Sequence, residues 1–236
     1  MLPELLSQIV LRLPIDDKLA AIGLTCKRNS WILYDVEFAR QHWKRRLPPG
    51  RSILVYTRSI LKKVWRDLPI GYRVAFFAEF FSRPFSKERD MCWEFHYQRF
   101  GVLSDQEALR ITKNLLALPS FHPRLNNQRM LQWACLYAPA KAVEIILASN
   151  RTQPVPVMGT CLLSVCKAER VDILALLLKD PRIDASSNNN ELLRKVCHRE
   201  FGCNNIAVIR LLVADPRVDA SIAQLKLEEL EGVINQ

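Results

Sequence analysis

Several thiols and one imidazole near the C-terminal end are the side chains whose types and spacing could do chemistry. Cys161, Cys166, Cys197, His198 and Cys203 carry the donor atoms that zinc prefers. The step from Cys161 to Cys166 is nevertheless wider than in most zinc knuckles, and two of these cysteines recur at one position of a repeat described below. A free cysteine at such a position behaves as a small hydrophobe. The pattern favours burial in a core and predicts no metal site.

Nucleophilic chemistry has one candidate, Cys203, which lies in an expected loop. A thiol that carries an acyl group needs exposure and a nearby cation that lowers its pKa. The seven glycines form neither GxGxxG nor GxxxxGK, and the chain contains no HExxH, GxSxG or paired-carboxylate layout. We therefore predict a protein that is not an enzyme and needs no cofactor.

Composition limits the class of protein further. A chain of 236 residues that is 49% apolar can form one elongated domain or two small ones. Seven cysteines, an odd number without a CxxC pair, are typical of a reducing compartment. Glu4 and Arg12 interrupt the apolar N-terminal stretch, no cleavage site follows it, and no apolar run approaches the ~20 residues that span a bilayer. These features predict a soluble intracellular protein without a membrane contact, in the cytoplasm, the nucleus or both.

A doubled heptapeptide is the first sign of repeats. DPRIDAS occupies residues 180–186, and DPRVDAS occupies residues 215–221. An apolar stripe at helical spacing precedes each copy. Because a residue before proline avoids the α region, Asp180 and Asp215 should mark helix ends.

The repeat extends upstream of these segments. An offset of 31 aligns residues 143–151 with 174–182 and places Cys135, Cys166 and Cys197 in one register. The last unit is longer by four residues, which we assign to the turn at 201–204. Two helices per unit are expected: inner helices over 128–137, 159–167 and 190–199, and outer helices over 140–149, 171–179 and 206–214.

This pattern resembles divergent ankyrin repeats, in which a loop, an inner helix, a tight turn and an outer helix recur. The units lack the family's Thr-Pro-Leu-His opening, so another helix-pair repeat remains the alternative. The resemblance implies an ankyrin-like solenoid over residues 119–236, with residues 221–236 as its closing helix.

The N-terminus has a helical pattern of its own. Pro3 suits a first helical turn, and a ladder of apolar residues follows until Pro14. Asp16 can cap a second helix, and Asp35 can cap a further helix that carries Phe38 and Trp43.

This stretch resembles the F-box, a helical motif that docks its protein onto the Skp adaptor of a cullin-based ubiquitin ligase. The likeness runs from Leu2 to about Trp43, with Leu-Pro, the ladder, Leu-Pro, Asp-Asp-x-Leu and Cys-Lys-Arg in family order. Trp31 lies further from Cys-Lys than the family's aromatic residue does, which leaves the register of the third helix open. The resemblance implies an F-box-like domain over residues 1–46. Its adaptor-binding residues would be Leu2, Pro3, Leu5, Leu6, Ile9, Leu13, Leu19, Leu24, Cys26 and Lys27.

Residues 47–118 are expected to form a helical linker region. Ser104 and Glu107 make a capping box that opens a helix towards Leu118. Seven of the ten phenylalanines fall within residues 76–100, a density that favours a core over a pocket. Residues 38–66 hold nine Lys or Arg and no acid. That segment favours a solvated helical face, with nucleic-acid binding as an alternative.

Together these patterns predict an all-α protein: an F-box-like trihelical motif, a helical linker and an ankyrin-like solenoid. The implied function is substrate recognition in a ubiquitin ligase, with a Skp adaptor and a cullin as partners and an unknown protein as substrate. The chain would act as a monomer within that hetero-complex. The alternatives are a scaffold outside any ligase and a nucleic-acid-binding protein. Short polar side chains are cheap to order against a partner, and alanine at 188–190 should leave stability nearly unchanged. The expected substrate face comprises Gln132, Ser186, Asn188, Asn189, Asn190 and Lys195.

Overall fold

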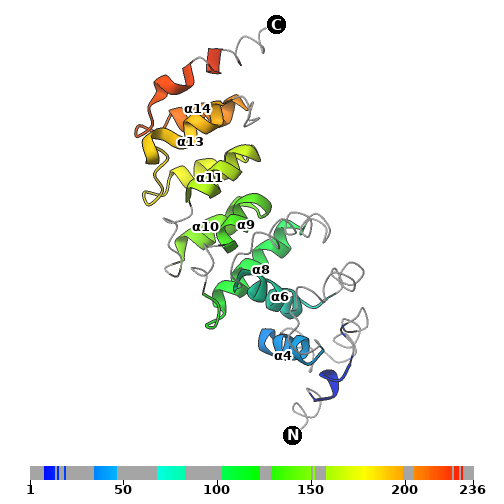
Figure 1. The fold of residues 1–236 in the computed structure, drawn as a ribbon. Coiled ribbons are helices and arrows are strands. Elements are labelled where there is room, and N and C mark those ends of the chain that lie inside the picture. Colours follow the sequence, from blue (N-terminus) through cyan, green and yellow to red (C-terminus); the bar gives the residue numbers. More distant parts are fainter. Residues whose placement is uncertain are drawn as a thin grey trace. The chain divides into compact units, whose positions relative to one another are not determined.

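The computed structural model describes residues 8–13, 15, 19, 35–46, 68–82, 103–122, 129–149, 151, 158–198, 205–224, 226–228 and 230. Every regular element among them is helical, so the chain is all-α (Figure 1). In this part of the chain, no helix has both the length and the apolar character that a membrane crossing needs. The helices are α4 (Val36–Arg46), α6 (Ile70–Ser82), α8 (Asp105–Ala117), α9 (Arg129–Tyr137), α10 (Ala140–Ala148), α11 (Met158–Lys167), α12 (Val171–Leu178), α13 (Ser187–Cys197), α14 (Ile206–Val213) and the 3₁₀ helix η4 (Ala220–Ala223).

The chain divides into two compact units. Unit 1 comprises Met1–His122, and unit 2 comprises Pro123–Gln236. Phe121 belongs to unit 1 because its ring packs on Phe81 of α6, with ring centroids 6.4 Å apart. The first unit therefore includes the loop that follows α8.

Helix α4 begins where its cap was predicted. The Phe38 N–H donates to Asp35 Oδ1 over 2.6 Å, which satisfies one of the amides that a first turn leaves unpaired. Val36, Phe38, Ala39, His42 and Trp43 form its buried stripe. The stripe packs on α6, where the Trp43 and Tyr72 rings meet edge to face with centroids 6.2 Å apart.

His42 ties the N-terminal segment to α4 and α6. Its Nε2 lies 2.8 Å from the Leu13 carbonyl and its Nδ1 lies 2.6 Å from the Tyr72 hydroxyl. A carbonyl can only accept, so Nε2 carries the proton and Nδ1 accepts from Tyr72. Burial lowers the pKa of His42, the Leu13 carbonyl opposes that shift, and Arg46 and Arg45 add to it. The neutral ring is therefore the form that holds this segment in place.

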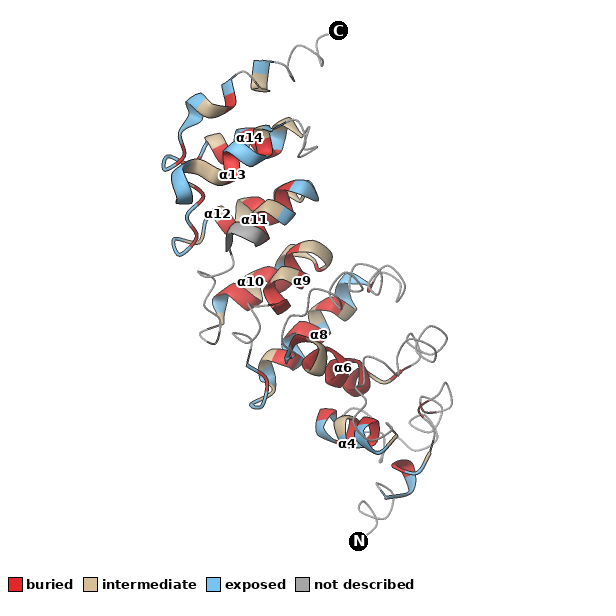
Figure 2. Cartoon of the chain, in the orientation of Figure 1, coloured by how far each residue is buried: buried red, intermediate tan, exposed pale blue. Residues whose placement is uncertain are grey.

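Helix α6 is buried along almost its whole length (Figure 2). Its arginine, Arg73, is 8% exposed and pairs with Glu107 of α8. Glu107 also accepts from the Ser104 N–H, while Ser104 Oγ accepts from the Glu107 N–H, so the predicted capping box is confirmed. One carboxylate thus starts α8 and neutralises the guanidinium that α6 buries. Burial raises the pKa of Glu107, but bonds from Arg73 and Ser104 outweigh it and hold that pKa below its usual value.

The phenylalanines of α6 form a core, as their density predicted for this part of the segment. Phe76, Phe77 and Phe81 are buried, and the Phe77 and Phe81 rings stack with centroids 5.5 Å apart. Residues 83–100, which hold the rest of that aromatic segment, lie outside the described residues.

Unit 2 is a row of helix pairs. Within each pair an inner helix packs on the outer helix that follows it: α9 on α10, α11 on α12, and α13 on α14. Between pairs, inner helices contact inner helices and outer helices contact outer ones. Each of the six predicted inner and outer helices agrees with an observed one within three residues at either end. Of the closing helix expected over 221–236, the structure describes the 3₁₀ helix η4 and helical residues at 224, 226–228 and 230.

Apolar side chains join the pairs into one core. Ile146 of α10, Ile173 and Leu177 of α12, and Ile209 of α14 are fully buried. Cys135 and Cys166 are also fully buried, and Cys197 is half-buried. The predicted register of these cysteines therefore points into the core in the first two pairs.

We expect His42 to give unit 1 a measurable acid sensitivity. Its folded pKa lies below the unfolded value of about 6.5, so its contribution is complete above that pH and is lost as the pH falls through the folded pKa. The free energy of unfolding should fall by up to about 1.4 kcal/mol per pH unit in that window. His42→Gln, whose amide can still donate to Leu13, should flatten the slope in melts from pH 7 to pH 5.

His122→Gln is the matched control, because His122 is exposed. An unchanged slope in His42→Gln, or a flattened slope in the control, would show that another group carries the dependence.

Candidate functional site

The predicted docking face contains one large apolar side chain that the fold leaves in solvent. Ile9 is 56% exposed, and it is the only large hydrophobic residue of the described residues that is exposed. It belongs to a helical turn at residues 8–10, and its neighbours Val10 and Leu11 are buried at 3% and 4% exposure. The turn is therefore anchored through Val10 and Leu11 while Ile9 projects outward.

Other predicted adaptor-binding residues have different surroundings. Leu13 is half-buried and its carbonyl accepts from His42. Leu19 is fully buried, so it supports the unit from within. Leu2, Pro3, Leu5, Leu6, Leu24, Cys26 and Lys27 lie outside the described residues.

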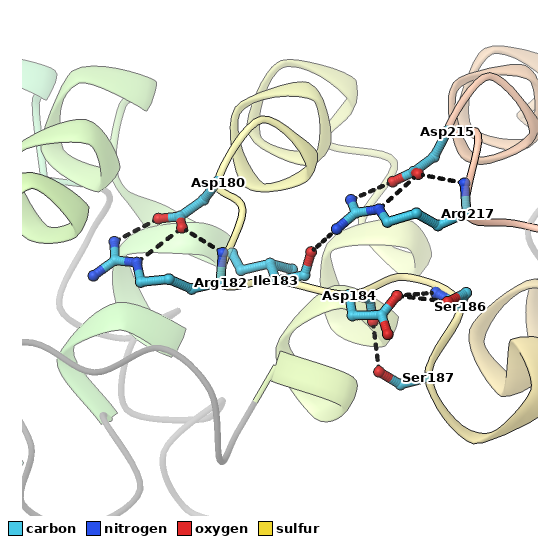
Figure 3. Close-up of polar contacts among 8 residues, drawn as sticks. All are labelled: Asp180, Arg182, Ile183, Asp184, Ser186, Ser187, Asp215 and Arg217. Atoms are coloured by element: carbon cyan, nitrogen blue, oxygen red, sulfur yellow. Dashed lines mark hydrogen bonds and ion pairs between the residues drawn. The ribbon is translucent and has the colours of Figure 1, made fainter.

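The doubled heptapeptide forms the same polar joint twice (Figure 3). Asp180 accepts from the Arg182 backbone N–H over 3.0 Å and from its guanidinium over 2.8 and 2.5 Å. Asp215 and Arg217 repeat this set at 3.0, 2.8 and 2.5 Å. The arginine bonds lower the pKa of both carboxyl groups. Helices α12 and α14 end just before the joint, as Asp-Pro predicted.

Each arginine also reaches the previous helix pair. Arg182 Nη2 donates to the Leu147 carbonyl over 2.9 Å, and Arg217 Nη1 donates to the Ile183 carbonyl over 2.8 Å. Because the aspartate holds the guanidinium in a fork, its remaining N–H groups point across the boundary between pairs. The motif is thus a bond between pairs as well as a helix end.

A second set of cross-pair bonds lies at the turn between inner and outer helices. Arg170 donates to the carbonyls of Leu136 and Ala138 over 3.2 and 3.0 Å. Asn205 caps α14 by accepting from the Ala207 N–H over 3.0 Å, and its Nδ2 donates to Glu169 over 3.2 Å. Residues before two successive outer helices therefore both reach one pair back.

The second aspartate of each heptapeptide organises the following loop. Asp184 Oδ1 accepts from the Ser186 N–H and hydroxyl over 2.9 and 2.6 Å. Asp219 does the same with Ser221 at 3.1 and 2.7 Å. The predicted local hydrogen bond of these aspartates is confirmed.

The polar stretch after Asp184 is an ordered left-handed turn. Asn188, Asn189 and Asn190 have φ of 56°, 58° and 59° with ψ of 45°, 50° and 35°. L-residues avoid this region, and asparagine is among the few that tolerate it. The right-handed part of α13 therefore starts at Glu191, although helix was expected from 190.

Polar contacts hold this turn in place. Asn190 Oδ1 accepts from the N–H of Asp219, the N-cap of η4, over 3.0 Å, and Arg194 Nε donates to the Asn189 carbonyl over 3.0 Å. Asn188 donates to Glu191 over 3.0 Å. Asn190 thus ties the start of α13 to the segment that follows α14, and alanine there is not expected to be neutral.

The predicted substrate residues lie in two parts of unit 2: Gln132 is on α9, and the others are on α13 or just before it. Ser186 and the asparagines follow the joint, with Asn188 and Asn189 exposed. Lys195 lies on α13, where it is exposed and forms an ion pair with Glu191 at 2.5 Å. Gln132 lies half-buried on α9, two pairs earlier.

Zinc chemistry finds no support in the described geometry. Among the residues that the structure describes, no three His, Cys, Asp or Glu side chains are grouped so that they could hold a metal ion. Cys161 and Cys166 are buried at 3% and 0% exposure. Cys203 lies outside the described residues.

The sequence analysis did not identify His42 or Arg170, and it did not predict the structural role of Asn190. A signal existed for His42, since it lies four residues after Phe38 and next to Trp43 on the apolar stripe of α4.

No protein-family model matches this chain, and no curated protein or solved structure matches it. The fold and the sites define an all-α protein whose second unit is a row of polar-bonded helix pairs.

We expect the Asp215–Arg217 joint to carry substantial stability. The Asp215 side chain is 5% exposed, so Arg217→Ala leaves a nearly buried carboxylate without its cation. The free energy of unfolding should fall by about 2–4 kcal/mol. Chemical denaturation measures it, and Lys179→Ala, an exposed lysine, should change it by less than about 0.5 kcal/mol. Equal losses in the two variants would assign the effect to general charge.

The left-handed turn gives a second stability test. Asn189→Ala should lower the free energy of unfolding by about 1 kcal/mol, whereas Asn189→Gly should leave it unchanged or raised, because glycine adopts positive φ readily. Asn190→Ala should cost more than Asn189→Ala because it also removes the bond to Asp219. If Asn189→Gly destabilises as much as Asn189→Ala, backbone conformation is not the cause.

Proposed function

We propose that this chain is the substrate-recognition subunit of a cullin-based ubiquitin ligase. Its F-box-like N-terminus docks on a Skp adaptor, and its ankyrin-like row of helix pairs holds the protein to be ubiquitinated. The exposure of Ile9 is the observation that carries the proposal. A large apolar side chain that the chain leaves in solvent, inside the stretch that resembles a docking motif, is what a helix-in-groove contact uses.

The way the turn is held supports the same role. Val10 and Leu11 anchor it in unit 1, and the Leu13 carbonyl is bonded to His42. A preorganised anchor loses less conformational entropy on binding than a mobile one does. The turn at residues 8–10 is therefore held in place for a partner to bind.

The row of helix pairs suits the role of holding a target. Its cross-pair bonds involve side chains at the turns and helix ends, so they leave exposed polar groups of α13 and the preceding turn in fixed positions. The target's identity is outside this proposal.

Ile9→Asp should abolish binding of the purified full chain to a Skp adaptor, because it places a carboxylate in an apolar groove. Ile9→Leu should bind nearly as well as the parent. Isothermal calorimetry measures both, and melts should show all three proteins folded, because residue 9 is exposed.

Recovery of the adaptor together with a cullin from a eukaryotic lysate extends the test to the complex. An Ile9→Asp chain that binds the adaptor as tightly as the parent would disprove this docking face. If the parent chain binds no adaptor, the ligase function is wrong and a scaffold outside any ligase becomes the favoured function.

A further inference from the structure

We propose that the face around Ile9 fits a protein groove whose apolar floor is bordered by carboxylates. The inference rests on the function proposed above and specifies the chemistry of the partner at that site. It concerns cations around Ile9 that the repeat and docking motifs do not explain.

Three exposed cations lie on the turn that carries Ile9 and on α4, which contacts that turn at Gln8. Arg12 is exposed and lies in the same turn, its backbone N–H donating to the Ile9 carbonyl over 3.0 Å. Arg45 of α4 is exposed, and its Nη1 donates to Oε1 of Gln8, the residue before Ile9, over 3.4 Å. Lys44, next to Arg45 in the last turn of α4, is also exposed.

Among the described residues, neither Arg12, Lys44 nor Arg45 forms an ion pair, and Arg45 meets only the neutral Gln8 amide. The acids of α4 are at its other end: Asp35 caps the helix, and Glu37 pairs with Arg40 at 3.5 Å. Among the described residues, the turn that carries Ile9 and the end of α4 therefore expose one large apolar side chain together with three cations.

The combination selects the class of partner. A nucleic acid would use the cations but gives Ile9 no complementary surface, since phosphate contacts are polar. One isoleucine contributes little to membrane insertion, which needs a large apolar face. A protein groove uses both parts: its floor takes Ile9, and carboxylates at its border accept from the guanidinium groups, which bind carboxylates as a fork. Complementary border charges act mainly on the association rate and its salt dependence.

The experiment compares four full-length chains: the parent, Arg12→Glu/Arg45→Glu, Ile9→Asp and the control Lys113→Glu/Lys179→Glu. The control reverses two exposed lysines and so changes the net charge equally. Binding kinetics to a purified Skp adaptor are measured at 50 and 500 mM NaCl. A phosphatidylserine vesicle and a single-stranded oligonucleotide serve as parallel probes, and melts confirm folding.

The parent's association rate should fall about tenfold or more between the two salt concentrations. Arg12→Glu/Arg45→Glu should bind at least about tenfold more weakly at 50 mM NaCl and lose most of the salt dependence, while the control keeps both. Adaptor variants with lysine in place of the carboxylates at the groove border should restore its binding.

The outcomes separate the two proposals. If the parent binds, Ile9→Asp does not, and neither charge reversal nor salt matters, the acidic border is wrong and the docking function stands. If the reversal leaves adaptor binding intact but removes binding to vesicles or oligonucleotide, the cations serve another class of ligand and the inference is overturned. If the parent does not bind the adaptor, the proposed function falls, and the partner inferred from it falls too.

Discussion

Hydrogen bonds from arginines to backbone carbonyls link each helix pair of unit 2 to the pair before it, alongside the shared apolar core. A helix leaves its last carbonyls without intrahelical partners, and one short pair has few side chains to satisfy them. Arg170, Arg182 and Arg217 each donate to carbonyls of the pair before. A guanidinium in such a position needs a countercharge, and Asp172, Asp180 and Asp215 supply it from two residues away. The two-residue spacing between each arginine and its aspartate meets this requirement.

Unit 1 meets a similar requirement with different groups. The helical turn at residues 8–10 is too short to persist alone, and its continuation at Leu13 presents a carbonyl to the interior. The neutral His42 ring donates from Nε2 to that carbonyl. Its other ring nitrogen, Nδ1, accepts a hydrogen bond from the Tyr72 hydroxyl. Burial of Val10 and Leu11 then fixes the turn, with Ile9 on its outer side. The exposure of Ile9 is thus a consequence of how its neighbours are bonded.

Local patterns predicted local structure well in this chain. Asp-Pro marked the ends of α12 and α14, Ser104 and Glu107 marked the start of α8, and Asp35 capped α4. The contacts of Asn190 with Asp219, of Arg170 with Leu136, and of His42 with Leu13 were not predicted. Each joins residues about 30 apart, and the repeat in unit 2 gives the distance between units but not which side chains bond across it. The left-handed turn needs three successive unfavourable conformations, and only the choice of asparagine hints at it. Of the docking face, the sequence predicted Ile9 but not which of its neighbours would be buried.

With the proposed function, stability and recognition would use different parts of the surface. In unit 2 the cross-pair bonds occupy the arginines at both turns, and the bond to Asp219 occupies Asn190. The groups that could contact a target are those that these bonds leave available, such as Asn188 and Lys195. Both of these are themselves bonded to Glu191, which fixes their direction without burying them. In unit 1 the bonds of His42 are internal, and the described residues expose one large apolar side chain, Ile9, together with cations that have no ion pair among those residues. A chain that docks on an adaptor through unit 1 and holds a target through unit 2 would use different interactions for each. The adaptor would be bound by hydrophobic burial with charge steering, and the target by complementary polar groups. Salt should then act on docking far more than on target capture.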